Sequence, residues 1–327
     1  MNKQNREKYI GHESQLYGVE EHRLMGGKGD GIRLFQVKNG LGLEFTVSAD
    51  RCADISRLSF QGMNYGFFAV NGYSAPAYYD DKGNGWLKSC NLGFMVTCGL
   101  TNVGIPSEDA GESLGLHGKA GHTPAENIYW DMDQEKIQIH AFIRHAGIFA
   151  EKLLQKRIIE CSLTENKISI IDRIRNVGDR TTPLMILYHM NMGYPLLDED
   201  SILDIRSDEV IPRNEHARKG FAEWNQVIPP QAGYEEMCYY HHFKNEGLAR
   251  IFQPKYQKGL AIHFDPKSLD EFVQWKMMGV KDYVMGLEPG NCEADGRDKM
   301  RAEGKLKFIQ PEEEKSFRID LEMIDHL

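Results

Sequence analysis

Three short segments combine residues that can transfer protons with residues that allow tight turns. In the first, glycines flank His117 closely, so a ligand and the backbone can both approach the imidazole. In the second, His189 and Asn191 are two positions apart and therefore share one face of a strand. The third is a strand that ends at Glu288, just before a Pro-Gly turn. A histidine and a carboxylate brought together can perform general acid–base catalysis.

Each of these positions also has an ordinary structural interpretation. The chain has 12 histidines, and an isolated histidine in a strand more often belongs to the core or the surface than to a catalytic site. A glutamate before Pro-Gly is often a solvated strand end. A metal site has less support, because His241 and His242 are adjacent and point to opposite faces of a strand. The sequence contains no H-x-x-x-H or H-E-x-x-H motif.

The composition disfavours several classes of partner. With 39 Lys and Arg against 48 Asp and Glu, the formal net charge is −9, and nucleic-acid binding needs clustered basic residues instead. No run of about 18 apolar residues is present, and the first residues lack the apolar core of a signal peptide. The six cysteines form no C-x-x-C pair and fit small buried residues in a reducing compartment. These features predict a cytoplasmic protein that binds a small molecule.

Alternation of apolar and polar residues with a period of two dominates the sequence and predicts strands. It is clear at 41–47, 137–141 and 317–323, and further β-rich runs occur at 168–174, 184–188, 260–264, 283–287 and 306–309. Turn signals separate these runs, and convincing helical patterns are scarce. Because no linker interrupts the strands, we predict an all-β fold. It is one large antiparallel β-sandwich over residues 1–327, with few short helices and a strand-poor lead-in segment over 1–25.

Five short motifs occur in a fixed order along the chain. They are Asp50-Arg51-Cys52-Ala53-Asp54-Ile55, Cys98-Gly99-Leu100-Thr101-Asn102-Val103-Gly104, Leu116-His117-Gly118, Tyr188-His189-Met190-Asn191 and Leu287-Glu288-Pro289. Together they resemble the aldose 1-epimerase (galactose mutarotase-like) superfamily, and most of all a divergent, uncharacterised branch of aldose epimerases. The resemblance extends from about Gly31 to the C-terminus. It implies a large β-sandwich, often called a supersandwich, with two central histidines and a late glutamate on one face.

The resemblance also implies roles for the three residues. Mutarotation opens and recloses a sugar ring, which requires a proton removed from the anomeric hydroxyl and a proton delivered to the ring oxygen. By resemblance, Glu288 is the base and His189 is the acid, and the two exchange roles on ring closure. His117 is similar to the histidine that binds sugar hydroxyls and polarises the ring oxygen. No metal or organic cofactor is implied.

Familiar galactose mutarotases also carry an arginine upstream of the first histidine. Lys88 and Arg51 are the candidates for this cationic contact, and Arg51 could instead form an ion pair with Asp54.

An aspartate between the second histidine and the glutamate has no clear match here, and Glu236 or His241 could face the ligand in its place. Gln274 and Trp275 lie on the strand that leads toward Glu288, where Trp275 could offer an apolar platform. The predicted sugar-binding set is therefore His117, Lys88, Arg51, Asn191, Glu236, His241 and Gln274.

Two other functions remain open from the sequence. One is a different sugar epimerase or a lyase on the same fold, and the other is a carbohydrate-binding module without catalysis. A pure binder has no need for a histidine and a glutamate that exchange protons, and a second-carbon epimerase would exchange a C–H proton with solvent. The sequence leaves the sugar, its charge and the oligomeric state open.

Overall fold

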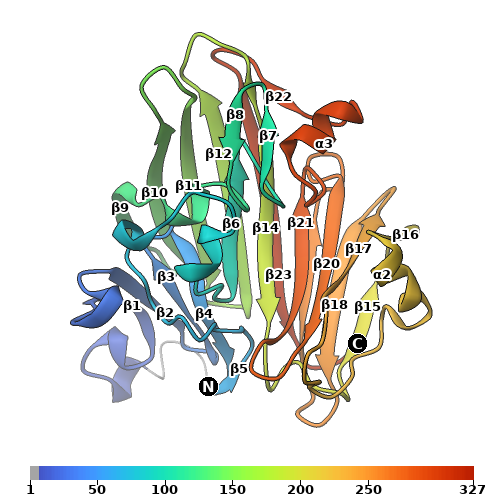
Figure 1. The fold of residues 1–327 in the computed structure, drawn as a ribbon. Helices are drawn as coiled ribbons and strands as arrows, with labels where there is room; N and C mark the ends of the chain where they lie inside the picture. The colour runs from blue at the N-terminus through green and yellow to red at the C-terminus, as the bar shows by residue number, and fades with distance from the viewer. Residues whose placement is uncertain (1–6) are drawn as a thin grey trace.

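The computed structural model describes residues 7–327, and its largest element is an eight-stranded antiparallel sheet (Figure 1). The long central strands of this sheet alternate buried and exposed positions, as expected where one face packs on a core and the other faces water. In spatial order the strands are β15 (Ile202–Ile205), β18 (Gly247–Gln253), β19 (Lys258–Phe264), β23 (Glu314–Ile324), β12 (Lys167–Asn176), β11 (Lys152–Ser162), β10 (Lys136–Ala146) and β9 (Ala125–Met132).

Two further sheets form the opposite layer of the sandwich (Figure 1). The six-stranded sheet has the order β16 (Glu209–Pro212), β17 (Met237–His242), β20 (Glu271–Met278), β21 (Tyr283–Gly290), β14 (Met185–Met192) and β6 (Met95–Leu100). The five-stranded sheet has the order β1 (Tyr17–Arg23), β2 (Arg33–Asn39), β3 (Leu43–Ser48), β4 (Asp54–Phe60) and β5 (Met63–Asn64).

The remaining elements are short. Two small ribbons pair β7 (Ser107–Asp109) with β8 (Glu112–Leu114) and β13 (Thr182–Pro183) with β22 (Phe308–Ile309). The α-helices are α2 (Glu215–Lys219) and α3 (Arg297–Ala302), and single 3₁₀ turns occur in the loops, including η5 (Gly85–Lys88) and η6 (Ala120–His122). No helix in residues 7–327 is long and apolar enough to cross a membrane.

The six-stranded sheet is apolar on both of its faces. Its inner face contributes Ile186, Tyr188 and Met190 of β14 to the main core between the two layers. Its outer face carries a second apolar cluster, to which Met185 and Leu187 belong, and loop residues such as Trp86 cover it. Every residue of β14 is therefore buried. A side chain on the outer face of this sheet lies beneath loops and can form part of an enclosed site.

The predicted all-β antiparallel sandwich is confirmed, and all six cysteines are buried and free. Two local predictions differ from the structure. Strand β1 lies inside the predicted lead-in segment, where it pairs with β2 at the sheet edge. Because β1 is mostly exposed, it lacks the apolar alternation that marks other strands; residues 1–6 lie outside the described residues. The run 306–309 forms only β22, since the backbone N–H of Leu306 donates to Met300 at the end of α3.

Candidate active site

Strand register brings His189 and Glu288 together. In the antiparallel pair β14 and β21, Leu187 lies opposite Gly290 and Asn191 lies opposite Gly286. This register places His189 level with Glu288 on the neighbouring strand. Both residues alternate with core-facing neighbours, so both side chains point to the outer, loop-covered face of the sheet.

The two side chains form a close buried pair. His189 Nδ1 lies 3.2 Å from Glu288 Oε1, and the exposed fractions of the two residues are 5% and 1%. Neither His189 Nδ1 nor Glu288 Oε1 has a hydrogen-bond partner among the residues that the structure describes. Gly286 makes room for the carboxyl group, because a Cβ atom at this position would collide with Glu288 Oε1. Buried polar groups are normally hydrogen-bonded, so this unsatisfied pair indicates a site that receives a polar ligand.

Burial drives both groups toward their neutral forms. It raises the pKa of Glu288 well above its usual value, and the nearby Glu236 carboxylate adds to this effect while Arg213 opposes it. Burial also lowers the pKa of His189 to about 4. The pKa of His117 is lowered too, by burial first and then by His189 and Arg213. A neutral carboxyl beside a neutral imidazole still offers one proton donor and one proton acceptor.

Backbone hydrogen bonds hold the His117 loop against strand β6. The Gly99 N–H donates to the His117 carbonyl at 2.9 Å, and the His117 N–H donates to the Gly104 carbonyl at 2.8 Å. The next residue, Gly118, has φ +70°, and a Cβ there would meet the Gly99 and Asn102 carbonyl oxygens. This close approach places the His117 ring 5.5 Å from the His189 ring, measured between centroids.

A pocket of about 530 Å³ opens above the pair. One side of it is a row of four rings, Trp86, His117, His189 and Trp275, which we call the aromatic wall. Successive ring centroids along this wall lie 4.9, 5.5 and 5.3 Å apart. Glu236 also lines the pocket, where its Oε2 accepts a hydrogen bond of 2.7 Å from Trp275 Nε1. A row of rings suits the C–H face of a sugar.

Arg213, just after β16, is the one lysine or arginine that lines the pocket in the described part of the chain. Its Nε donates to Asp295 Oδ1 at 2.6 Å, and its Nη2 donates to the Ala294 carbonyl at 3.3 Å. Sequence reasoning missed Arg213 and also Trp86. Arg213 lies between the second histidine and the glutamate, where the resemblance implies an acidic residue, and no motif marks a basic residue at this strand end.

The two predicted cationic contacts lie elsewhere. Lys88 is outside the pocket lining; its side chain is 74% exposed and its Nζ binds Asp80 at 2.9 Å. Arg51 is buried and also outside the lining. It donates to the carbonyls of Gly121, Ser74 and Ser89 and contacts His122. Arg51 thus joins three loops beside the pocket, and the alternative ion pair with Asp54 is not formed, because Asp54 binds Arg157.

Three more predicted contacts do not line the pocket. His241 and Gln274 point to the core face, since the outer face is taken by their neighbours Tyr240 and Val273. There His241 Nε2 lies 3.2 Å from Gln274 Oε1. Asn191 shares the face of His189, as predicted, but its Nδ2 donates to the His189 carbonyl and it is fully buried beside the pocket. Of the predicted residues, the structure brings together His117, His189, Glu236 and Glu288.

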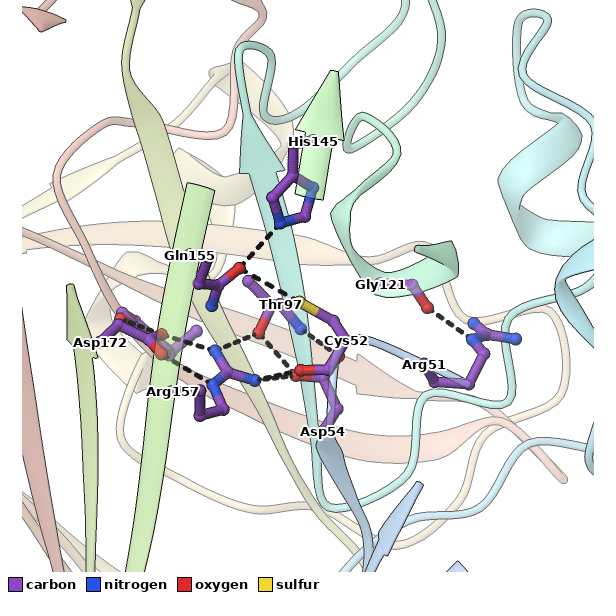
Figure 2. Close-up of polar contacts among 10 residues, drawn as sticks. Arg51, Cys52, Asp54, Thr97, Gly121, His145, Gln155, Arg157 and Asp172 are labelled. Atoms are coloured by element: carbon purple, nitrogen blue, oxygen red, sulfur yellow. Dashed lines mark hydrogen bonds and ion pairs between the residues drawn. The ribbon is translucent and has the colours of Figure 1, made fainter. Parts of the chain in front are cut away.

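A buried ionic network lies directly behind the site, on the core face of β6 and β14 (Figure 2). Arg157 of β11 is its centre. The guanidinium binds Asp172 through Nε and Nη2 and Asp54 through Nη1. Tyr188, the neighbour of His189, donates to Asp172 Oδ2 at 2.7 Å. This network connects the site strands to the opposite sheet.

One cluster outside the pocket has metal-ligating side chains. Ligand atoms of His242, Glu271 and Glu293 lie within 4.8 Å of one another. Ion pairs already engage these groups, because His242 lies between Glu209 and Glu271, and Glu293 binds Lys305. The cluster is explained as an ion-pair network at the end of the six-stranded sheet.

Residues 29–323 match the model of a family described as a domain of unknown function, DUF4432. The chain belongs to this family. No curated protein matches the chain. Family membership by itself names no reaction, so the functional argument rests on the site.

Solved structures with the same fold carry names of aldose and galactose epimerases and of mutarotase-like proteins. A "putative aldose 1-epimerase" from Klebsiella pneumoniae is 26% identical, with a TM-score of 0.90 over 96% of this chain and 86% of that one. Galactose 1-epimerase from Lactobacillus acidophilus is 13% identical, with a TM-score of 0.63 over 95% and 100%. A galactose mutarotase-like protein from Clostridium acetobutylicum is 13% identical, with a TM-score of 0.66 over 94% and 99%. The last two show the shared fold, and the resemblance noted from the motifs is confirmed.

Proposed function

We propose that this protein is an aldose 1-epimerase that interconverts the α and β anomers of a sugar. The observation that carries the proposal is the buried pair of His189 and Glu288 at the floor of a pocket, whose atoms Nδ1 and Oε1 lie 3.2 Å apart and have no hydrogen-bond partner among residues 7–327. The similar fold and the name of the Klebsiella pneumoniae protein support the same reaction.

The pair meets the proton requirement of ring opening. One group must take a proton from the anomeric hydroxyl, and the other must give a proton to the ring oxygen. The pair holds one transferable proton. In the ion-pair form Glu288 is the base and His189 the acid, whereas in the neutral form that burial favours Glu288 is the acid and His189 the base. After rotation about the C1–C2 bond, ring closure uses the two groups in exchanged roles.

Neighbouring residues have supporting roles in this proposal. His117 lies beside His189 and binds sugar hydroxyls, and Trp275 carries the C–H face of the ring. Arg213 lies near the developing negative charge on the anomeric oxygen and stabilises it. We further infer a cytoplasmic location, because free cysteines persist in a reducing compartment.

The test is the rate of anomer exchange, followed by NMR or polarimetry across a panel of aldoses. We expect Glu288→Gln to lose about 10²- to 10⁴-fold of the enzymatic acceleration, the usual contribution of one acid–base group. Glu293→Gln is the matched control, because Glu293 is also buried but lies outside the pocket. A fully active Glu288→Gln variant would overturn the proposal. Deuterium from solvent in a sugar C–H bond would instead indicate an epimerase acting at another carbon or a lyase.

A further inference from the structure

The floor of the pocket is polar, and its mouth carries exposed apolar side chains beside the exposed Asn84, Glu236 and Asp282. His189 and Glu288 at the floor are buried, whereas Val70, Leu87 and Ile105 line the same pocket with exposed fractions of 86%, 55% and 45%. These three side chains come from three separate segments, after β5, in η5 and after β6. Single exposed apolar residues are ordinary, but a group around one opening marks a binding surface.

Two polar side chains beside Leu87, Asn71 and Lys88, are engaged within the protein. Both amide hydrogens of Asn71 are used, since Nδ2 donates to the Leu87 and Cys90 carbonyls at 2.7 Å each. The Lys88 ammonium group donates to Asp80 Oδ2. A sugar hydroxyl that left water to lie against Val70, Leu87 or Ile105 would lose hydrogen bonds without replacement, at a cost of about 1–3 kcal/mol. An apolar group would instead gain about 25 cal/mol for each Å² buried.

The aromatic wall extends this apolar surface from the acid–base pair to the mouth. Trp86 at one end is buried, and its neighbour Leu87 lies at the opening. A ligand whose reacting carbon lies at Glu288 therefore meets indole and aliphatic surface on the side of the pocket that Trp86 and Leu87 form.

The charges around the pocket oppose an anionic ligand. Arg213 is paired with Asp295, and Glu236 and Asp282 also line the pocket. A carboxylate or phosphate on the sugar would face these two carboxylates and one cation that Asp295 already binds. These charges favour an uncharged ligand.

We infer that the substrate is an uncharged aldose that carries an apolar group on the part of the molecule away from C1. The inference rests on the proposed function for the position of the reacting carbon. A 6-deoxy sugar, which has a methyl group, and an acylated sugar, which has a longer chain, share this chemistry.

Matched pairs of sugars test the inference. Each pair differs only in the 6-hydroxyl: D-fucose and D-galactose, L-rhamnose and L-mannose, D-quinovose and D-glucose. We expect the 6-deoxy member of at least one pair to have a kcat/KM for anomer exchange about 10-fold higher, the usual value of one well-placed methyl group. A 6-O-butyryl hexose distinguishes the longer substituent from the methyl group. Equal or faster exchange of the hydroxylated parent in every pair, and no gain with the acylated sugar, overturns the inference.

A variant of the mouth provides the structural test. Leu87→Ser should reduce the preference for the apolar member several-fold, because it removes apolar surface from the opening. Ile148→Ser is the control: Ile148 is 87% exposed between β10 and β11, outside this pocket, and the change should leave the preference intact. Both residues are exposed, so both variants should fold. An unchanged preference in Leu87→Ser contradicts the inference.

Binding separates this inference from the proposed function. Trp86 and Trp275 line the pocket, so their fluorescence reports sugar binding without catalysis. Preferential binding of the 6-deoxy or acylated sugars without anomer exchange supports the ligand class and overturns the proposed reaction. Exchange without preference overturns the ligand class and keeps the reaction. Neither binding nor exchange with any sugar overturns both.

Discussion

Two buried clusters of ionisable side chains lie back to back on strand β14, and they differ in how well their polar atoms are satisfied. On the core face, Arg157 uses all five of its N–H groups (Figure 2), binding Asp172, Asp54, the Cys52 carbonyl and Thr97. On the outer face, His189 Nδ1 and Glu288 Oε1 have no hydrogen-bond partner in the described part of the chain. Tyr188 and His189 are consecutive residues, yet they belong to these two different environments.

This difference indicates that the two clusters have different roles. A fully satisfied buried network stabilises one arrangement of the strands, and removing a charged member leaves a buried charge uncompensated. A buried pair without partners destabilises the empty protein and remains available to a ligand. The network behind the site therefore holds β6 and β14 in place, while the pair in front is the part that we propose reacts.

The largest expected effect is the loss of Arg157. Arg157→Met leaves Asp54 and Asp172 buried without their cation, and we expect a loss of about 3–5 kcal/mol in the free energy of unfolding. The control is Arg144→Met, which removes an exposed ion pair with Glu126 and should cost at most about 1 kcal/mol. Urea denaturation measures both. Similar losses in the two variants would contradict the structural role of the network.

A second prediction concerns the pH dependence of activity. Below about pH 4 His189 becomes protonated, the pair holds two protons, and no base remains. Burial raises the pKa of Glu288, so the carboxyl keeps its proton well above its usual range and the acid is lost only at higher pH. We expect a bell-shaped profile of kcat/KM whose two limbs each fall about tenfold per pH unit. If kcat/KM instead stays constant as the pH falls through 4, this pair does not transfer the proton.

The same comparison explains what the sequence could predict. Period-two alternation predicted the strands and placed His189 and Asn191 on one face, because these are local properties of a strand. The level pairing of His189 with Glu288 depends on the register of β14 and β21, which are far apart in the sequence. No local pattern carries that register, so the pairing came from the resemblance alone.

The misplaced candidates have physical causes as well. Strand β17 reads Met-Cys-Tyr-Tyr-His-His and is buried on both faces, so its sequence does not show which residues face the core. The sequence therefore also permits His241 to line the pocket, but its ring lies on the core face against Phe272. The cation of the pocket, Arg213, follows a short strand, and its position depends on how that strand pairs at the sheet edge.

A third prediction concerns the stability of the site itself. Because the pKa of Glu288 is raised in the folded protein, the folded state binds a proton more tightly than the unfolded state. Stability therefore falls as pH rises from the usual glutamate pKa toward the raised one. Glu288→Gln removes this titration, and we expect a gain of about 1 kcal/mol at pH 8, or about 2–4 °C in Tm. The gain should shrink as pH falls toward 4.5. Thermal unfolding at several pH values checks this, and a variant less stable at pH 8 would contradict it.

The smallest expected effect is that of replacing Lys88, which the sequence predicts as a candidate for the cationic contact of the site. Its ammonium group is exposed and binds Asp80 at the surface, so the pair is screened by water and salt. We expect Lys88→Ala to change kcat/KM for anomer exchange by less than about twofold and to leave Tm unchanged within error. Arg213→Met is the comparison, because Arg213 lines the pocket and its loss should lower kcat/KM by about tenfold or more. If Lys88→Ala raises KM strongly while Arg213→Met does not, then the segment that holds Lys88 must turn into the pocket when sugar binds, and the cation of this site is the one expected from the family motifs.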